Sequence, residues 1–274
     1  MCQSGPPFSG NAQPSRCVQL CVLRLVKVAF HSNLHWTGLP LTSRPGFFRC
    51  AIFPALLIVA QTLAAQSSQK WTADSVLALM DSSARDFHTL SGNIDHIKYT
   101  AVVDDTSKES GQIWLQKKDE RMRIEFSKPD ARTILRSGDS LFIYNPKINR
   151  VEEYNLGKNR ALVDQYVLLG FGTRSENVKK SYEVGFVGEQ DLDGKKAIVL
   201  ELTPKSDEIR AQISKVQIWV DESSWLPMQQ KFFEAGSADY LIFHYGDVRK
   251  NLRIDESKFK PDWPKNVTKV KPRG

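Results

Sequence analysis

Apolar and polar residues alternate along most of the chain from about residue 90 onward. In 121–126, Met122, Ile124 and Phe126 alternate with charged residues, and this period of two is typical of a strand with one buried face. The segments 198–202 and 215–220 alternate in the same way. Further strands are predicted at 95–103, 112–116, 140–144, 151–156, 182–187, 228–234 and 238–245. Turn signals rich in Pro, Gly and Asp separate these segments, and spacings of roughly 8–15 residues predict an antiparallel meander, open or closed into a barrel.

Two segments have the spacing of helices instead. Residues 72–87 begin with Thr72 as the expected N-cap, and apolar residues recur at helical spacing as far as Phe87. Residues 161–172 read ALVDQYVLLGFG and are apolar over a wide face, so a helix here must be buried. We therefore predict an α+β fold, mainly antiparallel β, in which a curved sheet buries two apolar helical segments.

The first 65 residues have the composition of an export leader. They hold all four cysteines and no Asp or Glu, whereas all 31 acidic residues follow them. Arg44 and Arg49 precede an apolar run at 51–60, and small residues come next. This order of basic, apolar and small residues predicts a secretory signal that is cleaved after Ala64 or Ala65.

A retained membrane anchor is the less favoured alternative for this segment. About 20 consecutive apolar residues are needed to span a bilayer, and Pro54 and Gln61 interrupt the run. We therefore expect a leader at 1–65 and one exported domain at 66–274.

The composition of the exported part limits its chemistry. Five of the 38 basic residues lie in the leader, which leaves 33 basic against 31 acidic residues, so there is no basic excess to indicate nucleic-acid binding. No cysteine follows Cys50, which excludes thiol catalysis and cysteine-based zinc sites in this part. The 209 residues after the leader suffice for one domain with a full hydrophobic core.

Familiar motifs for catalysis or metal binding do not occur in the exported part. His88, His96 and His244 show no metal-ligand spacing, and we expect them on the surface of helices or strands. Gly170-x-Gly172 lacks a third glycine, so we interpret it as the end of a helix rather than a nucleotide-binding loop. We therefore expect no enzyme activity, no cofactor and no metal site.

Some strands are apolar on both faces, and 141–144 and 240–243 are examples. A helix on one side and a second layer on the other would cover such strands. Alternatively, the strands line an apolar internal cavity. The pattern of residues leaves both interpretations open.

Several short blocks resemble the outer-membrane lipoprotein carrier (LolA-like) family and occur in that family's order. The blocks are SGQIWL at 110–115, SGDSLFIYNP at 137–146, LELTPK at 200–205, IWVD at 218–221, FKP at 259–261 and PKNV at 264–267. The resemblance implies an unclosed half-barrel of about eleven strands, with helices covering an apolar cavity. It also implies a monomeric periplasmic carrier without a cofactor, which takes lipoproteins from an inner-membrane transporter to an outer-membrane receptor.

If the protein is such a carrier, we expect nine side chains to line the cavity or its lid, and the alternative for each of them is ordinary core packing. They are Met122, Ile124, Phe126, Leu141, Ile143, Leu162, Tyr166, Leu169 and Phe171. Where the family has an Arg-Pro pair that pins the lid, this chain has Lys117 and Lys118, and lysine lacks the planar donor fork of arginine. We expect these lysines to contact a lid carbonyl or an anionic group, or to be solvated. The alternative function is a half-barrel sensor or regulatory module that binds lipoproteins or lipids.

Overall fold

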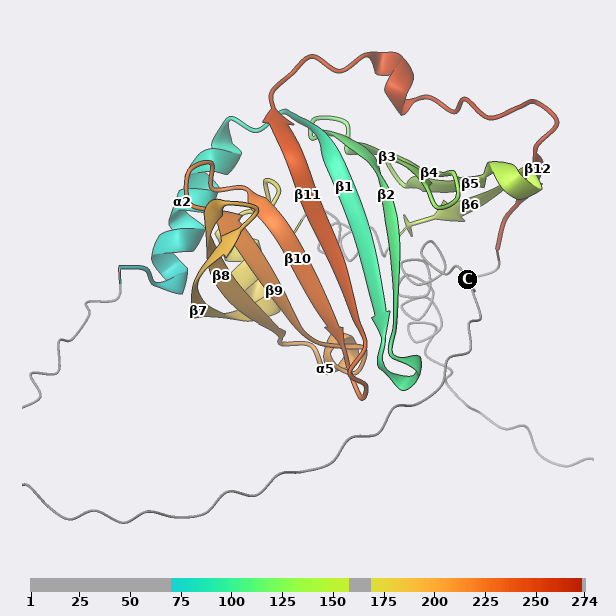
Figure 1. Cartoon of the computed structure of the whole chain (residues 1–274). Helices are drawn as coiled ribbons and strands as arrows, with labels where there is room; N and C mark the ends of the chain where they lie inside the picture. The colour runs from blue at the N-terminus through green and yellow to red at the C-terminus, as the bar shows by residue number, and fades with distance from the viewer. Residues whose placement is uncertain (1–69, 158–168, 273–274) are drawn as a thin grey trace, which may run out of the picture.

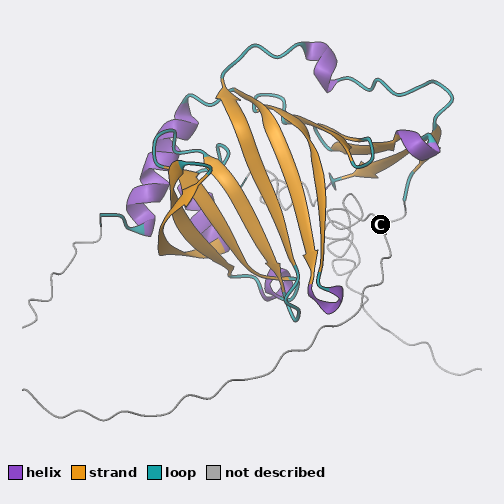
Figure 2. Ribbon diagram, in the orientation of Figure 1, coloured by secondary structure: helices purple, strands orange, loops and turns teal. Residues whose placement is uncertain are grey.

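The computed structural model of the 274-residue chain describes residues 70–157 and 169–272 (Figures 1 and 2). The predicted leader and most of the predicted helix at 161–172 lie outside the described residues. Twelve strands form one sheet in the order β12-β6-β5-β4-β3-β2-β1-β11-β10-β9-β8-β7. Their bounds are β1 Thr89–Thr100, β2 Asp105–Gln116, β3 Arg121–Lys128, β4 Arg132–Ser137, β5 Ser140–Asn145, β6 Arg150–Asn155, β7 Tyr182–Leu192, β8 Lys195–Pro204, β9 Ile213–Asp221, β10 Pro227–Glu234, β11 Tyr240–Lys250 and β12 Thr268–Val270.

The sheet is antiparallel apart from one short pairing. β12 runs parallel to β6, and the other neighbouring strands pair antiparallel. The edge strands β7 and β12 do not pair with each other, so the barrel is not closed. Figure 1 shows the sheet curving away from β1 and β11 on both sides. The predicted open half-barrel is confirmed, with twelve strands where the resemblance implied about eleven.

The longest described helix is α2, Ala73–Arg85. The Thr72 side chain accepts a hydrogen bond from the Ser75 backbone, and the Ser75 side chain accepts one from the Thr72 backbone, which together form a capping box. Shorter helices are α4 Ser175–Ser181, α5 Asp207–Arg210, η1 Ala101–Val103, η2 Pro146–Ile148 and η4 Glu256–Phe259. The apolar stripe of α2 buries Val76 and Leu77 against strands β7–β11, so this predicted helix has its expected buried face.

Strand register decides which side chains point to the concave face. Met122 lies opposite Leu115 and Ile124 lies opposite Ile113, and all four side chains are buried on this face. Two apolar clusters cover the face: one lies mainly on β1–β6, and the other joins β7–β11 to α2 and α4. Phe243 on β11 packs against both clusters. The described interior therefore has two apolar halves that meet at β11.

The C-terminal segment covers the convex face of the first half. Arg123 on β3 is buried there, and its guanidinium lies 2.6 Å from the Asp262 carboxylate and donates to the carbonyls of Lys258 and Lys260. Trp263 packs against the ring of Phe142, with 5.4 Å between centroids. The segment then ends as β12 beside β6. The strand at 141–144, which is apolar on both faces, is thus covered on the convex side by the chain's own C-terminal residues.

Candidate functional site

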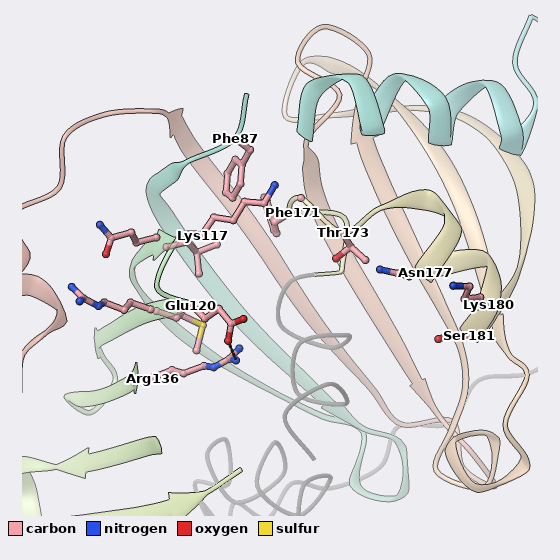
Figure 3. A pocket seen from close by; sticks show the side chains of 14 residues that line it. Phe87, Lys117, Glu120, Arg136, Phe171, Thr173, Asn177, Lys180 and Ser181 are labelled. Atoms are coloured by element: carbon pink, nitrogen blue, oxygen red, sulfur yellow. Dashed lines mark hydrogen bonds and ion pairs between the residues drawn. The ribbon is translucent and has the colours of Figure 1, made fainter. Parts of the chain in front are cut away.

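A cavity of about 580 Å³ lies between the β2–β3 hairpin and α4 (Figure 3). The β2, hairpin, β3 and β4 residues form one bank, and α4 forms the other. Phe87 and the segment 171–173 lie between the banks. The lining side chains are Phe87, Leu115, Gln116, Lys117, Glu120, Arg121, Met122, Arg136, Phe171, Thr173, Asn177, Lys180 and Ser181, with Gly172 contributing backbone. The cavity therefore joins strands from the first half of the sheet to a helix on the second half.

The floor of the cavity is apolar. Phe87, Leu115, Met122 and Phe171 line it and belong to the cluster on the first half of the sheet. The ring of Phe171 meets Tyr245 edge to face, with 4.9 Å between centroids. Such aromatic contacts favour one orientation of the rings. Phe171 is therefore held against the sheet.

A buried hydrogen-bond chain positions this part of the floor. The Tyr245 hydroxyl donates to the Gln230 side-chain oxygen at 3.1 Å, and the Gln230 amide nitrogen donates to the Leu169 carbonyl. Gln230 is fully buried, so both hydrogen bonds are shielded from water. Burial raises the pKa of Tyr245, which keeps the hydroxyl protonated as the donor. The chain thereby ties Leu169 to strands β10 and β11.

The two glycines beside Phe171 allow the backbone to pass close to its neighbours. Gly170 has φ +85° and Gly172 has φ +76°, which is the left-handed region that favours glycine. A Cβ at Gly170 would lie 2.6 Å from Pro227 Cγ, and one at Gly172 would lie 3.2 Å from Phe87 Cδ1. The Gly170-x-Gly172 motif therefore serves packing in this segment.

Cationic side chains line the cavity both at its exposed rim and in its buried part. Lys117 in the hairpin donates from Nζ to the Ala84 carbonyl, near the C-terminal end of α2, at 3.2 Å. Cations are favourable at this end of a helix because its last carbonyls carry partial negative charge. Arg136 is buried, and its Nη2 lies 3.3 Å from the Glu120 carboxylate. Lys180 on α4 adds a further positive charge on the opposite bank.

The structure brings some of the predicted site residues to this cavity. Met122, Phe171 and Lys117 line it. Lys118 lies in the exposed hairpin turn and is not among the lining residues. Ile124, Phe126, Leu141 and Ile143 are buried on the same concave face, in the cluster that contains Met122 and Phe171.

The remaining predicted residues lie elsewhere. Leu169 packs in the other cluster, against α2. Leu162 and Tyr166 lie outside the described residues. For this whole set, contact with acyl chains or a lid stays a prediction.

The expectation that His96 is a surface residue is wrong. Its side chain is 2% exposed and lies on the concave face, with Nδ1 3.1 Å from the Glu109 carboxylate. The same carboxylate accepts a hydrogen bond from Arg132 at 2.5 Å. Burial lowers the pKa of His96. His96 comes two residues after the buried Ile94 on β1, so both side chains point to the same face of the strand. This spacing is the signal that could have placed the histidine inside.

Sequence reasoning also missed Asn177, Lys180 and Arg136. The short helix α4 reads SENVKKS, and its only buried residue is Val178, so it has no apolar stripe to predict it. Within residues 70–157 and 169–272, no three His, Asp or Glu side chains gather as a metal site. Each helix in this part of the chain is too short or too polar to cross a bilayer.

Comparison with known sequences gives one family and one curated relative. A family model described as "Uncharacterized protein" matches residues 118–261. The relative is the "Uncharacterized protein MJ0687" of Methanocaldococcus jannaschii, 24% identical over 127 residues. That alignment covers 46% of this chain and 34% of the relative, so the chain spans about a third of the length of the relative it matches.

Solved structures show similarity of fold. An uncharacterized conserved protein from Thermus thermophilus is 10% identical with a TM-score of 0.50, and the match covers 73% of this chain and 99% of that one. The LolA superfamily protein NE2245 from Nitrosomonas europaea is 15% identical with a TM-score of 0.36, and the match covers 70% of this chain and 98% of that one. The structure of the Pseudomonas aeruginosa MucA/MucB complex is 16% identical with a TM-score of 0.43, and the match covers 69% of this chain and 61% of that one.

The open antiparallel half-barrel that the motifs predict is therefore confirmed as a fold, and the Thermus thermophilus structure is similar to it. Because the family model matches more than half of its 274 residues, the chain belongs to that family of uncharacterized proteins.

Proposed function

We propose that the protein is an exported, periplasmic carrier that holds lipoprotein acyl chains in its half-barrel. In this role it would receive lipoproteins from an inner-membrane transporter and deliver them to an outer-membrane receptor. The observation that carries the proposal is the cavity of about 580 Å³, which has an apolar floor inside an unclosed sheet. This volume lies within the range of about 300–1,000 Å³ that is typical of small-molecule sites. No catalytic step is part of the proposal.

The energetics of acyl chains explain why a carrier needs such a cavity. Each CH₂ group removed from water gains about 0.8 kcal/mol, so a 16-carbon chain gains on the order of 12 kcal/mol. A membrane offers a comparable gain, and net transfer is therefore possible only if the carrier is close to balance with it. A carrier of this kind needs an apolar interior that opens at low cost.

The contact between Lys117 and Ala84 suits a low-cost opening. It joins the hairpin on one bank to the end of α2 through a single hydrogen bond from an exposed side chain. A typical hydrogen bond contributes about 0.5–1.5 kcal/mol net, and exposure favours the lower end of that range. Breaking this hydrogen bond therefore costs far less than the gain from one acyl chain.

The test is release of a lipoprotein from membranes. Spheroplasts that contain a labelled lipoprotein are incubated with the purified protein, and we expect the lipoprotein to appear in a soluble complex whose mass equals the sum of the two by native mass spectrometry. Absence of release at saturating protein would overturn the carrier role. If lipid binds without lipoprotein release, and the protein instead associates with a membrane regulator, the sensor alternative replaces the carrier.

A charge placed on the cavity floor gives a site-specific version of this test. Met122→Glu should abolish release, because the glutamate must be desolvated when an acyl chain enters. Ile148→Glu is the matched control, since Ile148 lies on η2 and is 59% exposed. Far-UV circular dichroism and thermal unfolding establish that both variants fold. Unchanged release by a folded Met122→Glu variant would remove this cavity from the site.

A further inference from the structure

Two ammonium groups face the cavity from opposite banks. Lys117 lies in the β2–β3 hairpin and Lys180 lies on α4, and both line the cavity (Figure 3). Lys117 donates to a neutral carbonyl rather than to a carboxylate. In the part of the chain that the structure describes, neither lysine forms an ion pair with an acidic side chain. Their charges are therefore available to a ligand.

The other charged side chains of the rim compensate one another. Arg136 is paired with Glu120, the only carboxylate among the described lining residues. Arg121 is paired with Asp119 and Glu256. The uncompensated charge at the mouth is thus carried by the two lysines, and it is positive.

Neutral polar groups lie beside these lysines. Asn177 is one turn before Lys180 on α4 and also lines the cavity, and Thr173 lies between the two banks. The apolar floor consists of Phe87, Leu115, Met122 and Phe171, all of them buried. The site thus combines an apolar floor with two uncompensated positive charges at its rim. This combination is complementary to an amphiphile with an anionic head.

We propose that the cavity binds amphiphiles with an anionic phosphate or carboxylate head, with Lys117 and Lys180 contacting the head and the apolar floor contacting the chain. This inference rests on the proposed acyl-chain binding and adds a charge preference to it. A neutral amphiphile of equal chain length would leave both lysines without an anionic partner. It should therefore bind more weakly.

Calorimetric titration with two 12-carbon probes tests this preference below their micelle concentrations. One probe is lauroyl lysophosphatidylglycerol, which is anionic, and the other is monolauroylglycerol, which is neutral. Two exposed ion pairs together are worth roughly 2- to 30-fold in affinity, so we expect the anionic probe to bind about tenfold more tightly at low salt. The preference should shrink at high salt, because exposed charges are screened.

Variants separate the lysines from general electrostatics. Lys117→Gln/Lys180→Gln should reduce the preference to about twofold or less, and because the preference is a ratio, loss of the Lys117–Ala84 hydrogen bond affects both probes alike. Lys179→Gln is the control for general electrostatics. It removes one positive charge from the same helix α4, but Lys179 pairs with Asp74 and does not line the cavity. Lys179→Gln should keep the full preference.

The outcomes distinguish this inference from the proposed function. Equal binding of both probes by the wild-type protein, or an undiminished preference in the double variant, overturns the charge inference and leaves acyl-chain binding intact. Displacement of the anionic probe by equimolar inorganic phosphate would mean that the site takes the free anion, which also overturns it. If neither probe binds, acyl-chain binding fails, and the charge inference fails with it.

Discussion

Replacing Gly170 by alanine should destabilise the protein more than the same change at a glycine with similar backbone geometry. A Cβ at Gly170 would lie 2.6 Å from Pro227 Cγ and 3.3 Å from Met80 Cε, at φ +85°. Gly236 has φ +74°, and nothing lies within 4 Å of a Cβ placed there. Both variants therefore carry the cost of a left-handed alanine, and only Gly170→Ala adds a steric conflict.

The backbone cost and the steric cost can be estimated separately. A left-handed backbone costs a non-glycine residue about 1–2 kcal/mol, and inserting an extra methyl into a packed site adds about 1–3 kcal/mol. Gly236→Ala should therefore lower the free energy of unfolding by about 1–2 kcal/mol, and Gly170→Ala by about 2–5 kcal/mol. In a domain of this size each kcal/mol lowers Tm by about 2–4 °C, so the Gly170 variant should lose roughly 4–20 °C.

Urea unfolding of the two alanine variants measures this difference, and a double-mutant cycle identifies its source. Pro227→Ala removes the ring atoms nearest to the added methyl, so Gly170→Ala/Pro227→Ala should recover about 1–3 kcal/mol relative to the sum of the single changes. Equal losses in Gly170→Ala and Gly236→Ala, or a cycle with no coupling energy, would refute the argument that close packing requires glycine at this position.

Two further predictions concern buried polar side chains. Arg123→Ala should lower the free energy of unfolding by about 1–3 kcal/mol and expose 252–272 to limited proteolysis, because the guanidinium holds Asp262 and two carbonyls of that segment. The control Arg121→Ala removes exposed pairs and should cost under about 1 kcal/mol; an equal loss in both variants would contradict this role. Burial lowers the pKa of His96 in the folded protein. As pH falls below about 6.5, this histidine is therefore protonated more in the unfolded chain than in the folded one, and the free energy of unfolding should decline. His96→Gln should flatten this decline between pH 7.5 and 5 in urea unfolding, and an unchanged slope would show that other groups cause it.

Alternation predicted strands well wherever one face of the strand is polar. The pattern of Met122, Ile124 and Phe126 was sufficient for β3, because its convex face carries charged residues. The same reasoning missed β4, Arg132–Ser137, since two arginines occupy its concave face on either side of Ile134. Those arginines are paired with Glu109 and Glu120. Partners so distant in the sequence leave no local pattern.

The ends of strands and the pairing of distant segments also could not be predicted from the local pattern of apolar and polar residues. The predicted strand at 95–103 overran its end, because the chain turns into η1 at Ala101–Val103 and Asp104 adopts φ 47°. The parallel pairing of β12 with β6 joins segments more than 100 residues apart. Its three residues are too few to show a period.

The candidate site could be predicted in part for the same reason. Met122 and Phe171 lie in apolar patterns, and both line the cavity. Lys180 lies in a short polar helix, and only the curvature of the sheet brings it across from Lys117. A cationic mouth assembled from two distant segments has no sequence signature of its own.

The position of the cavity bears on how a carrier of this shape could open. β1 and β11 are joined by a long antiparallel ladder at the centre of the sheet, so parting the two halves there would break many backbone hydrogen bonds at once. On the concave side, the hairpin bank meets α2 through the exposed hydrogen bond of Lys117. Movement of the hairpin away from α2 would break this hydrogen bond and leave the ladder intact, whereas α2 and α4 are held against the sheet by their buried residues. The carrier proposal therefore expects an acyl chain to enter on the hairpin side of the cavity, where Lys117 and the apolar residues Leu115 and Met122 lie.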